Sequence, residues 1–75
     1  MMLVGVYYMK LFIVVNSVGK FFAGISEITG QAMWFDCSSD ISGHASDCGA
    51  LRLKRDGRWL AKAIKSDSTA TWKEI

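Results

Sequence analysis

The first fifteen residues, MMLVGVYYMKLFIVV, are almost continuously apolar, and Lys10 is their only charged side chain. Their β-branched and aromatic residues favour a strand buried on both faces, which we predict over about residues 3–15. A membrane helix is disfavoured, because a lysine at its middle costs about 2.5–3.5 kcal/mol. No basic segment precedes the apolar run and no small-residue cleavage site follows it, so a signal peptide is not indicated. Met1, Met2 and Met9 are alternative translation starts of the chain.

The chain has 75 residues, of which 51% are hydrophobic, and it contains no proline. We predict a single domain over residues 1–75, near the lower size limit for one hydrophobic core. A domain this small has little interior, so its apolar content predicts that a partner, a second copy or a membrane covers part of its surface.

Strand and turn signals alternate through the next segment. NSVGK, residues 16–20, is typical of a turn with Gly19 at positive φ. KFFAGISEI, residues 20–28, predicts a second strand with a bulge at Gly24. After a turn at ITGQ, QAMWF predicts a third strand that ends at Asp36.

The segment that follows Cys48 has two interpretations. Leu51 and Leu53 alternate with charged residues, and Asp56-Gly57 separates two such runs, which is typical of a β-hairpin. Alternatively, Ser46 begins a helix over about residues 47–55 that ends before Gly57. With a last strand in SDSTATWKEI, we predict an all-β fold, a small antiparallel meander, sandwich or barrel-like domain of five or six strands that forms oligomers. The alternative is an α+β fold with one short helix at about 47–55.

The loop DCSSDISGHASDC, residues 36–48, gathers most of the residue types used in chemistry. Cys37, His44 and Cys48 are candidate metal ligands, but no pair has zinc-knuckle spacing, and the aspartates do not follow a calcium-loop pattern. No serine here has the strand–turn–helix elbow that presents a nucleophile. We therefore predict no enzymatic activity, no metal and no cofactor. Cys37 and Cys48 either form a disulfide worth about 3 kcal/mol or remain reduced.

Charge is divided unequally along the chain. Residues 1–48 carry two lysines and four acidic side chains, whereas residues 49–75 carry seven basic and three acidic side chains. On a hairpin over residues 52–65, one outward face would collect basic side chains, with Trp59 on the other. The candidate binding residues are Arg52, Lys54, Arg55, Arg58, Trp59, Lys62 and His44, with Lys65 on the same face. Such a face binds nucleic acid or simply keeps a sheet soluble.

Two resemblances concern the carboxy-terminal part. Asp67, Thr71 and Trp72 stand at the Asp, Thr and Trp positions of the sialidase-type Asp-box, which implies a β-hairpin at 65–72; Lys65 and Thr69 depart from that motif. Residues 49–75 also resemble the closing strands of phage tail-fibre receptor-binding tips. The shared pattern is a glycine, alternating aliphatic residues, a basic residue, a turn with glycine, an aromatic residue, and a final aromatic–basic pair. Its residues in this chain are Gly49, Leu51, Leu53, Arg55, Gly57, Trp59, Trp72 and Lys73.

The tail-fibre resemblance implies a phage or prophage protein, a trimeric tip, and binding to a glycan or protein of the host surface. Loop 36–48 and the hairpin tip Arg55–Arg58 would then be the contact surfaces, and the protein would belong to the virion or the host cytoplasm. Our leading hypothesis is accordingly a non-enzymatic recognition protein. The alternatives are a small phage-encoded inhibitor of a host protein, acting through an exposed strand, and a nucleic-acid-binding protein that uses residues 52–65.

Overall fold

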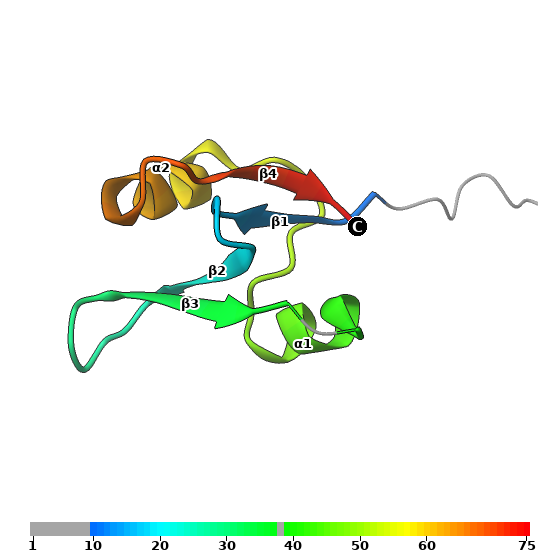
Figure 1. Cartoon of the computed structure of the whole chain (residues 1–75), viewed down its shortest axis with the longest axis horizontal. Helices are drawn as coiled ribbons and strands as arrows, with labels where there is room; N and C mark the ends of the chain where they lie inside the picture. Colours follow the sequence, from blue (N-terminus) through cyan, green and yellow to red (C-terminus); the bar gives the residue numbers. More distant parts are fainter. Residues whose placement is uncertain (1–9, 38) are drawn as a thin grey trace, which may run out of the picture.

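The computed structural model describes residues 10–37 and 39–75. An antiparallel sheet has the strand order β3-β2-β1-β4 and is accompanied by two short helices (Figure 1). The elements are β1 (Phe12–Val15), β2 (Lys20–Ile25), β3 (Ala32–Asp36), α1 (Ile41–Asp47), α2 (Gly57–Ser66) and β4 (Thr71–Glu74). The fold is therefore mainly β with added helix. The described part of the chain has four strands, not the five or six predicted.

Strand β1 lies inside the sheet, between β2 and β4, and its side chains Ile13 and Val14 are fully buried. The prediction of a strand buried on both faces is confirmed for Phe12–Val15, and residues 3–9 of the predicted strand lie outside the described residues. Neither described helix has the length and apolar composition that a membrane span requires.

The local turn signals of the sequence are confirmed. The side-chain Oδ1 of Asn16 accepts hydrogen bonds from the backbone N–H groups of Val18 and Lys20, and Gly19 has a φ of 84°. The register between β2 and β3 shifts between Phe22 and Ile25, and Gly24 in this interval has a φ of 99°. This shift is the predicted bulge, and it needs a residue without Cβ because L side chains avoid positive φ.

The helices pack on opposite faces of the sheet. Successive side chains of a strand point to opposite faces, so Ile13 and Phe21 share a face that Val14 and Phe22 do not. Ile13 and Phe21 form a buried cluster with Ala45 of α1, whereas Val14 and Phe22 form one with Ala63 of α2.

The sheet opens between β1 and β2. These strands are paired at Val15 and Phe21. At Phe12, the neighbour of β1 on the side away from β4 is Arg52, whose backbone exchanges hydrogen bonds of 2.8 and 2.9 Å with Phe12. Trp59 of α2 contacts both buried clusters. Its ring centroid lies 4.8 Å from that of Phe22, and the guanidinium carbon of Arg52 lies 3.7 Å from the Trp59 ring centroid.

The predicted hairpin around Asp56-Gly57 is wrong, because Asp56 begins helix α2. Its carboxylate Oδ1 accepts a hydrogen bond of 2.9 Å from the backbone N–H of Arg58, which satisfies one of the free donors at a helix start. Gly57 does not adopt the positive φ that a two-residue hairpin turn requires. Helix formation wins because Trp59, Leu60 and Ala63 then share one side that packs against the sheet.

The alternative helix at about 47–55 is also misplaced, because helix α1 occupies Ile41–Asp47, inside the segment predicted as a loop. Asp40 caps its start, with Oδ1 accepting a hydrogen bond of 3.2 Å from the backbone N–H of Gly43. Gly49, with a φ of 70°, ends it by a Schellman-type turn in which the Ala50 N–H donates to the Ala45 carbonyl.

The Asp-box-like hairpin at 65–72 is likewise not formed, because α2 extends through Ser66 and only the strand β4 follows. Asp67 instead organises the turn between them. Its Oδ1 accepts hydrogen bonds from the backbone N–H and the hydroxyl of Thr69, at 2.9 and 2.6 Å. The Thr69 hydroxyl oxygen accepts a hydrogen bond of 3.0 Å from the N–H of Ser17, which joins this turn to the β1–β2 turn.

We expect this turn to make stability depend on pH. The hydrogen bonds from the hydroxyl and the N–H of Thr69 lower the pKa of Asp67 from its ordinary value of 3.8. A carboxylate with a lowered folded pKa contributes stability above its unfolded pKa, and that contribution is lost as the pH falls through the folded pKa. Urea unfolding at pH 6 and at pH 2.5 would measure this. Between these pH values the free energy of unfolding should fall less for Asp67→Asn than for wild type, with Thr69→Val intermediate. An acid loss unchanged in Asp67→Asn would contradict this assignment.

Candidate functional site

The described residues of the cysteine loop are not arranged as a metal site. Cys37 is exposed, Cys48 is partly buried, and the structure does not join them by a disulfide bond; which of the two alternatives holds stays a prediction. The His44 ring packs against aromatic side chains, with its centroid 5.0 Å from that of Phe21 and 6.0 Å from that of Phe35. No group of three His, Cys, Asp or Glu within residues 10–37 and 39–75 is arranged to hold a metal ion, so Cys37, His44 and Cys48 are not brought together as ligands.

Basic side chains occupy the exposed side of α2. Arg58, Lys62 and Lys65 are spaced by four and three residues, so they share one side of the helix, and all three are exposed. The opposite side of α2 is in contact with the sheet through Trp59, Leu60 and Ala63. At about 1.5 Å of rise per residue, the three cations extend over about 10 Å along the helix.

Two arginines ahead of α2 lie on the same face of the sheet and are held by aromatic rings. The guanidinium of Arg52 stacks on Trp59, and its Nη1 donates hydrogen bonds to the carbonyls of Gly49 and Leu51. The guanidinium carbon of Arg55 lies 5.2 Å from the ring centroid of Phe12, whose side chain points to the α2 face like that of Val14. We call Arg55, Arg58, Lys62 and Lys65, which are all exposed, the basic face.

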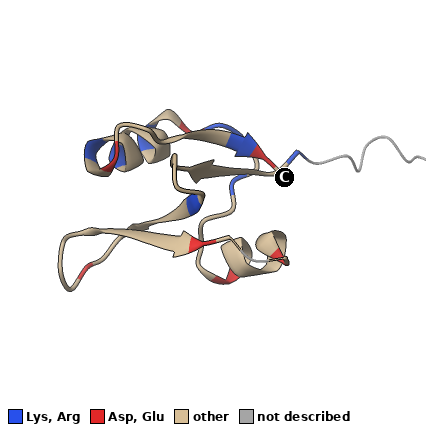
Figure 2. Ribbon diagram, in the orientation of Figure 1, with Lys and Arg blue, Asp and Glu red and all other residues tan. Residues whose placement is uncertain are grey.

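The basic face has no carboxylate partner in the described part of the chain. The ion pair found among the described residues joins Lys20 of β2 to Asp36 of β3, with 3.9 Å between the ammonium nitrogen and a carboxylate oxygen. The two aspartates next to α2 are engaged at its ends, Asp56 as the N-terminal cap and Asp67 in the turn with Thr69. Figure 2 shows the other acidic positions along the β2–β3 loop, at the end of β3, in α1 and at the end of β4, whereas the body of α2 is marked by basic positions. The basic positions are thus concentrated on α2, although Glu74 of β4, which pairs with Phe12, shares the α2 face of the sheet.

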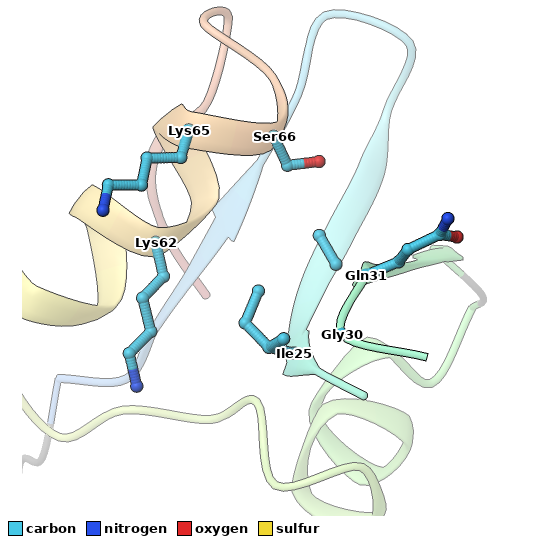
Figure 3. A pocket seen from close by; sticks show the side chains of 7 residues that line it. Ile25, Gly30, Gln31, Lys62, Lys65 and Ser66 are labelled. Atoms are coloured by element: carbon cyan, nitrogen blue, oxygen red, sulfur yellow. The ribbon is translucent and has the colours of Figure 1, made fainter. Parts of the chain in front are cut away.

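A groove of about 610 Å³ lies beside the basic face, between the carboxy-terminal half of α2 and the β2–β3 loop (Figure 3). Its lining includes basic, polar and apolar groups and no acidic side chain; the lining residues are Ile25, Gly30, Gln31, Ala32, Lys62, Lys65 and Ser66. The Ser66 hydroxyl oxygen accepts a hydrogen bond of 3.0 Å from Trp34 Nε1, which fixes the end of α2 against β3.

The predicted binding residues divide into three groups in the structure. Arg55, Arg58 and Lys62 are exposed on the α2 side, and Lys65 adjoins Lys62 as the sequence suggested. Arg52 and Trp59 are half-buried and stack on each other, so they belong to the packing beneath the exposed cations. Lys54 is exposed in the segment before α2, and His44 belongs to the packing of α1 on the other face. Whether these residues bind a partner stays a prediction.

Sequence reasoning did not identify Ile25, Gln31 and Ser66 as neighbours of the lysines. They come from a strand end, a loop and a helix end, and only the packing of α2 on β2 and β3 brings them together. No local pattern marks them. Comparison of the chain with protein-family models, curated proteins and solved structures finds no match.

Proposed function

We propose that this protein is a non-enzymatic binding protein that contacts nucleic acid through the basic face. The observation that carries the proposal is the absence of carboxylate partners for Arg55, Arg58, Lys62 and Lys65 among the described residues. Unpaired cations on one face attract a polyanion and release its condensed counterions on binding. Basic stripes of this kind are the electrostatic signature of nucleic-acid-binding surfaces.

The packing of α2 favours nucleic acid over a lipid surface as the polyanion. A helix that lies on a membrane inserts its apolar side into the lipid. In this protein that side, with Trp59, Leu60 and Ala63, is already packed against the sheet. The exposed side carries Arg58, Lys62 and Lys65, and Ile64 is its one large exposed apolar residue, at 43%. The three cations suit a row of backbone phosphates.

The tail-fibre resemblance does not carry this proposal. It rests on a strand-like rhythm across residues 49–75, and residues 57–66 of that segment are helical. Recognition of a host surface therefore stays a prediction. Contact with a protein, including a second copy of this chain, is a second candidate, because β3 is an edge strand of the described sheet and exposes Phe35. An edge strand offers unpaired backbone groups for β-addition.

The proposed function predicts binding that weakens steeply with salt. Four phosphate contacts on duplex DNA give a slope of about −3.6 in log K against log salt, so affinity should fall about a hundredfold between 50 and 200 mM salt. Fluorescence anisotropy with a labelled duplex and a labelled single strand would measure this. The double variant Lys62→Gln/Lys65→Gln should reduce the slope by about two.

Lys73→Gln is the matched control for these lysine variants. Lys73 is exposed and pairs with Ile13, whose side chain points to the α1 face, so Lys73 lies on the face opposite the basic face. The control removes the same charge and should change the slope by much less. Absence of binding at 50 mM salt, or equal effects of the double variant and of Lys73→Gln when corrected for charge, would overturn the proposal.

A further inference from the structure

The groove beside α2 combines cationic and apolar surface more closely than the rest of the basic face. Lys62 and Lys65 line one wall, and Ile25, whose side chain is 40% exposed, lies on the β2 side (Figure 3). No Asp or Glu lines the groove to neutralise the lysines. Its volume of about 610 Å³ falls in the range of about 300–1,000 Å³ typical of small-ligand sites.

Ser66 supplies a hydrogen-bond donor to this groove. Its oxygen accepts the Nε1–H of Trp34 at 3.0 Å, so its own hydroxyl proton remains available. In Figure 3 the hydroxyl extends from the end of α2 toward the β2–β3 side of the groove. An anionic oxygen placed there would accept this proton together with contacts from the lysines.

The end of α2 affects an anion in two opposing ways. Its unpaired carbonyls are equivalent to about half a negative charge, which disfavours an anion. Lys62 and Lys65 contribute two full positive charges, so the net field favours one. Their ammonium groups point away from Gln31 in Figure 3, and both side chains are exposed, so their flexible stems allow them to turn toward a ligand.

A phosphate monoester fits this charge better than a phosphodiester does. A monoester carries about −1.5 to −2 charges at neutral pH, and a diester carries one, whereas the groove presents two ammonium groups. The exposed Ile25 and the neighbouring Ala32 give an apolar surface for an organic part attached to the phosphate.

We infer that this groove binds the monoester phosphate of a nucleotide, with Lys62 and Lys65 pairing with the phosphate and Ser66 donating a hydrogen bond to it. The sugar and base lie over Ile25. The inference rests on the proposed function, because the phosphorylated end of a nucleic-acid strand presents this group. A free mononucleotide presents the same chemistry, and the experiment below separates the two sources.

Backbone amide shifts of the ¹⁵N-labelled protein would test the site directly. The probes are AMP, adenosine, and one short oligonucleotide with and without a 5′-phosphate. We expect the amides of Gly30, Gln31 and Ser66 to shift with AMP and with the phosphorylated strand, and not with adenosine. Lys62→Gln and Lys65→Gln should each weaken AMP binding about fivefold, as expected for loss of a charge-assisted contact. Lys73→Gln should leave AMP binding unchanged.

The outcomes separate this inference from the proposed function. Shifts that are equal for AMP and adenosine, or absent at these three amides with every phosphate-bearing probe, overturn the phosphate site. Salt-dependent binding of the oligonucleotide that ignores its 5′-phosphate, with no AMP-specific shift at these amides, overturns the site but supports the proposed function. Binding of AMP at these amides without any binding of either oligonucleotide supports the site and identifies its ligand as a free nucleotide. That result overturns the proposed function.

Discussion

Phe22→Ala is expected to remove about 3–5 kcal/mol from the free energy of unfolding. Phe22 is fully buried, and its ring centroid lies 4.8 Å from that of Trp59 and 5.3 Å from that of Trp34. The truncation leaves a cavity where α2 meets the sheet, which rigid neighbours fill incompletely. A domain of this size has a total stability of about 4–11 kcal/mol, so the loss is a large part of it. Urea unfolding followed by circular dichroism would measure it.

Phe35→Ala is the matched control, because it deletes the same atoms from a position that is 37% exposed on the edge strand β3. Its loss should be about 1 kcal/mol or less, as is usual for surface truncations. Should Phe22→Ala fail to fold, Phe22→Leu keeps most of the volume and should lose about 1 kcal/mol. Equal losses for the two alanine variants would contradict the assignment of Phe22 to the centre of the core.

Gly24→Ala is expected to lose about 1–3 kcal/mol, the usual range for a residue held in a strained backbone conformation. Gly24 has a φ of 99°, and a Cβ built on it would lie 3.4 Å from Cη2 of Trp59. That separation is ordinary contact, so the backbone dominates the loss for alanine. Gly24→Val, whose methyl groups extend further toward Trp59, should lose more. Thermal and urea unfolding of the two variants would rank them.

Two other glycines separate the cost of a positive φ from the cost of a contact made by the new Cβ. Gly30 has a φ of 72° with nothing within 4 Å of a built Cβ, so Gly30→Ala measures the backbone effect alone. Gly57 has open space and no positive φ, and because alanine favours a helix, Gly57→Ala should be neutral or stabilising by up to about 1 kcal/mol. If Gly24→Ala were as well tolerated as Gly57→Ala, the bulge and its contact with Trp59 would not be as described.

The turns and the bulge could be predicted because their physical cause is local. Asn16 satisfies nearby backbone groups with its own side chain, and Gly19 and Gly24 adopt positive φ, which other residues avoid. The third strand was predicted one residue early, at 31–35 against Ala32–Asp36, and a last strand is present as β4. These signals need only a few neighbouring residues.

The helices were misjudged because their signals depend on the rest of the fold. Asp56-Gly57 serves equally well as a hairpin turn or as a helix start, and the choice depends on whether Trp59, Leu60 and Ala63 find a sheet face to cover. The candidate site could be predicted only in part. Arg58, Lys62 and Lys65 stand out as cations, but Ile25, Gln31 and Ser66 join them only through packing.

The sequence by itself determined the uneven distribution of charge, the strand character of the buried segments and the positions where the backbone must turn. These properties follow from residue types and from spacings of a few positions. Only the tertiary structure decided that α2 covers one face of the sheet, that Trp59 contacts both buried clusters, and that two lysines border a groove with Ile25 and Ser66. The reason is that burial of apolar surface is non-local, so a segment's conformation depends on which distant residues are available to cover it.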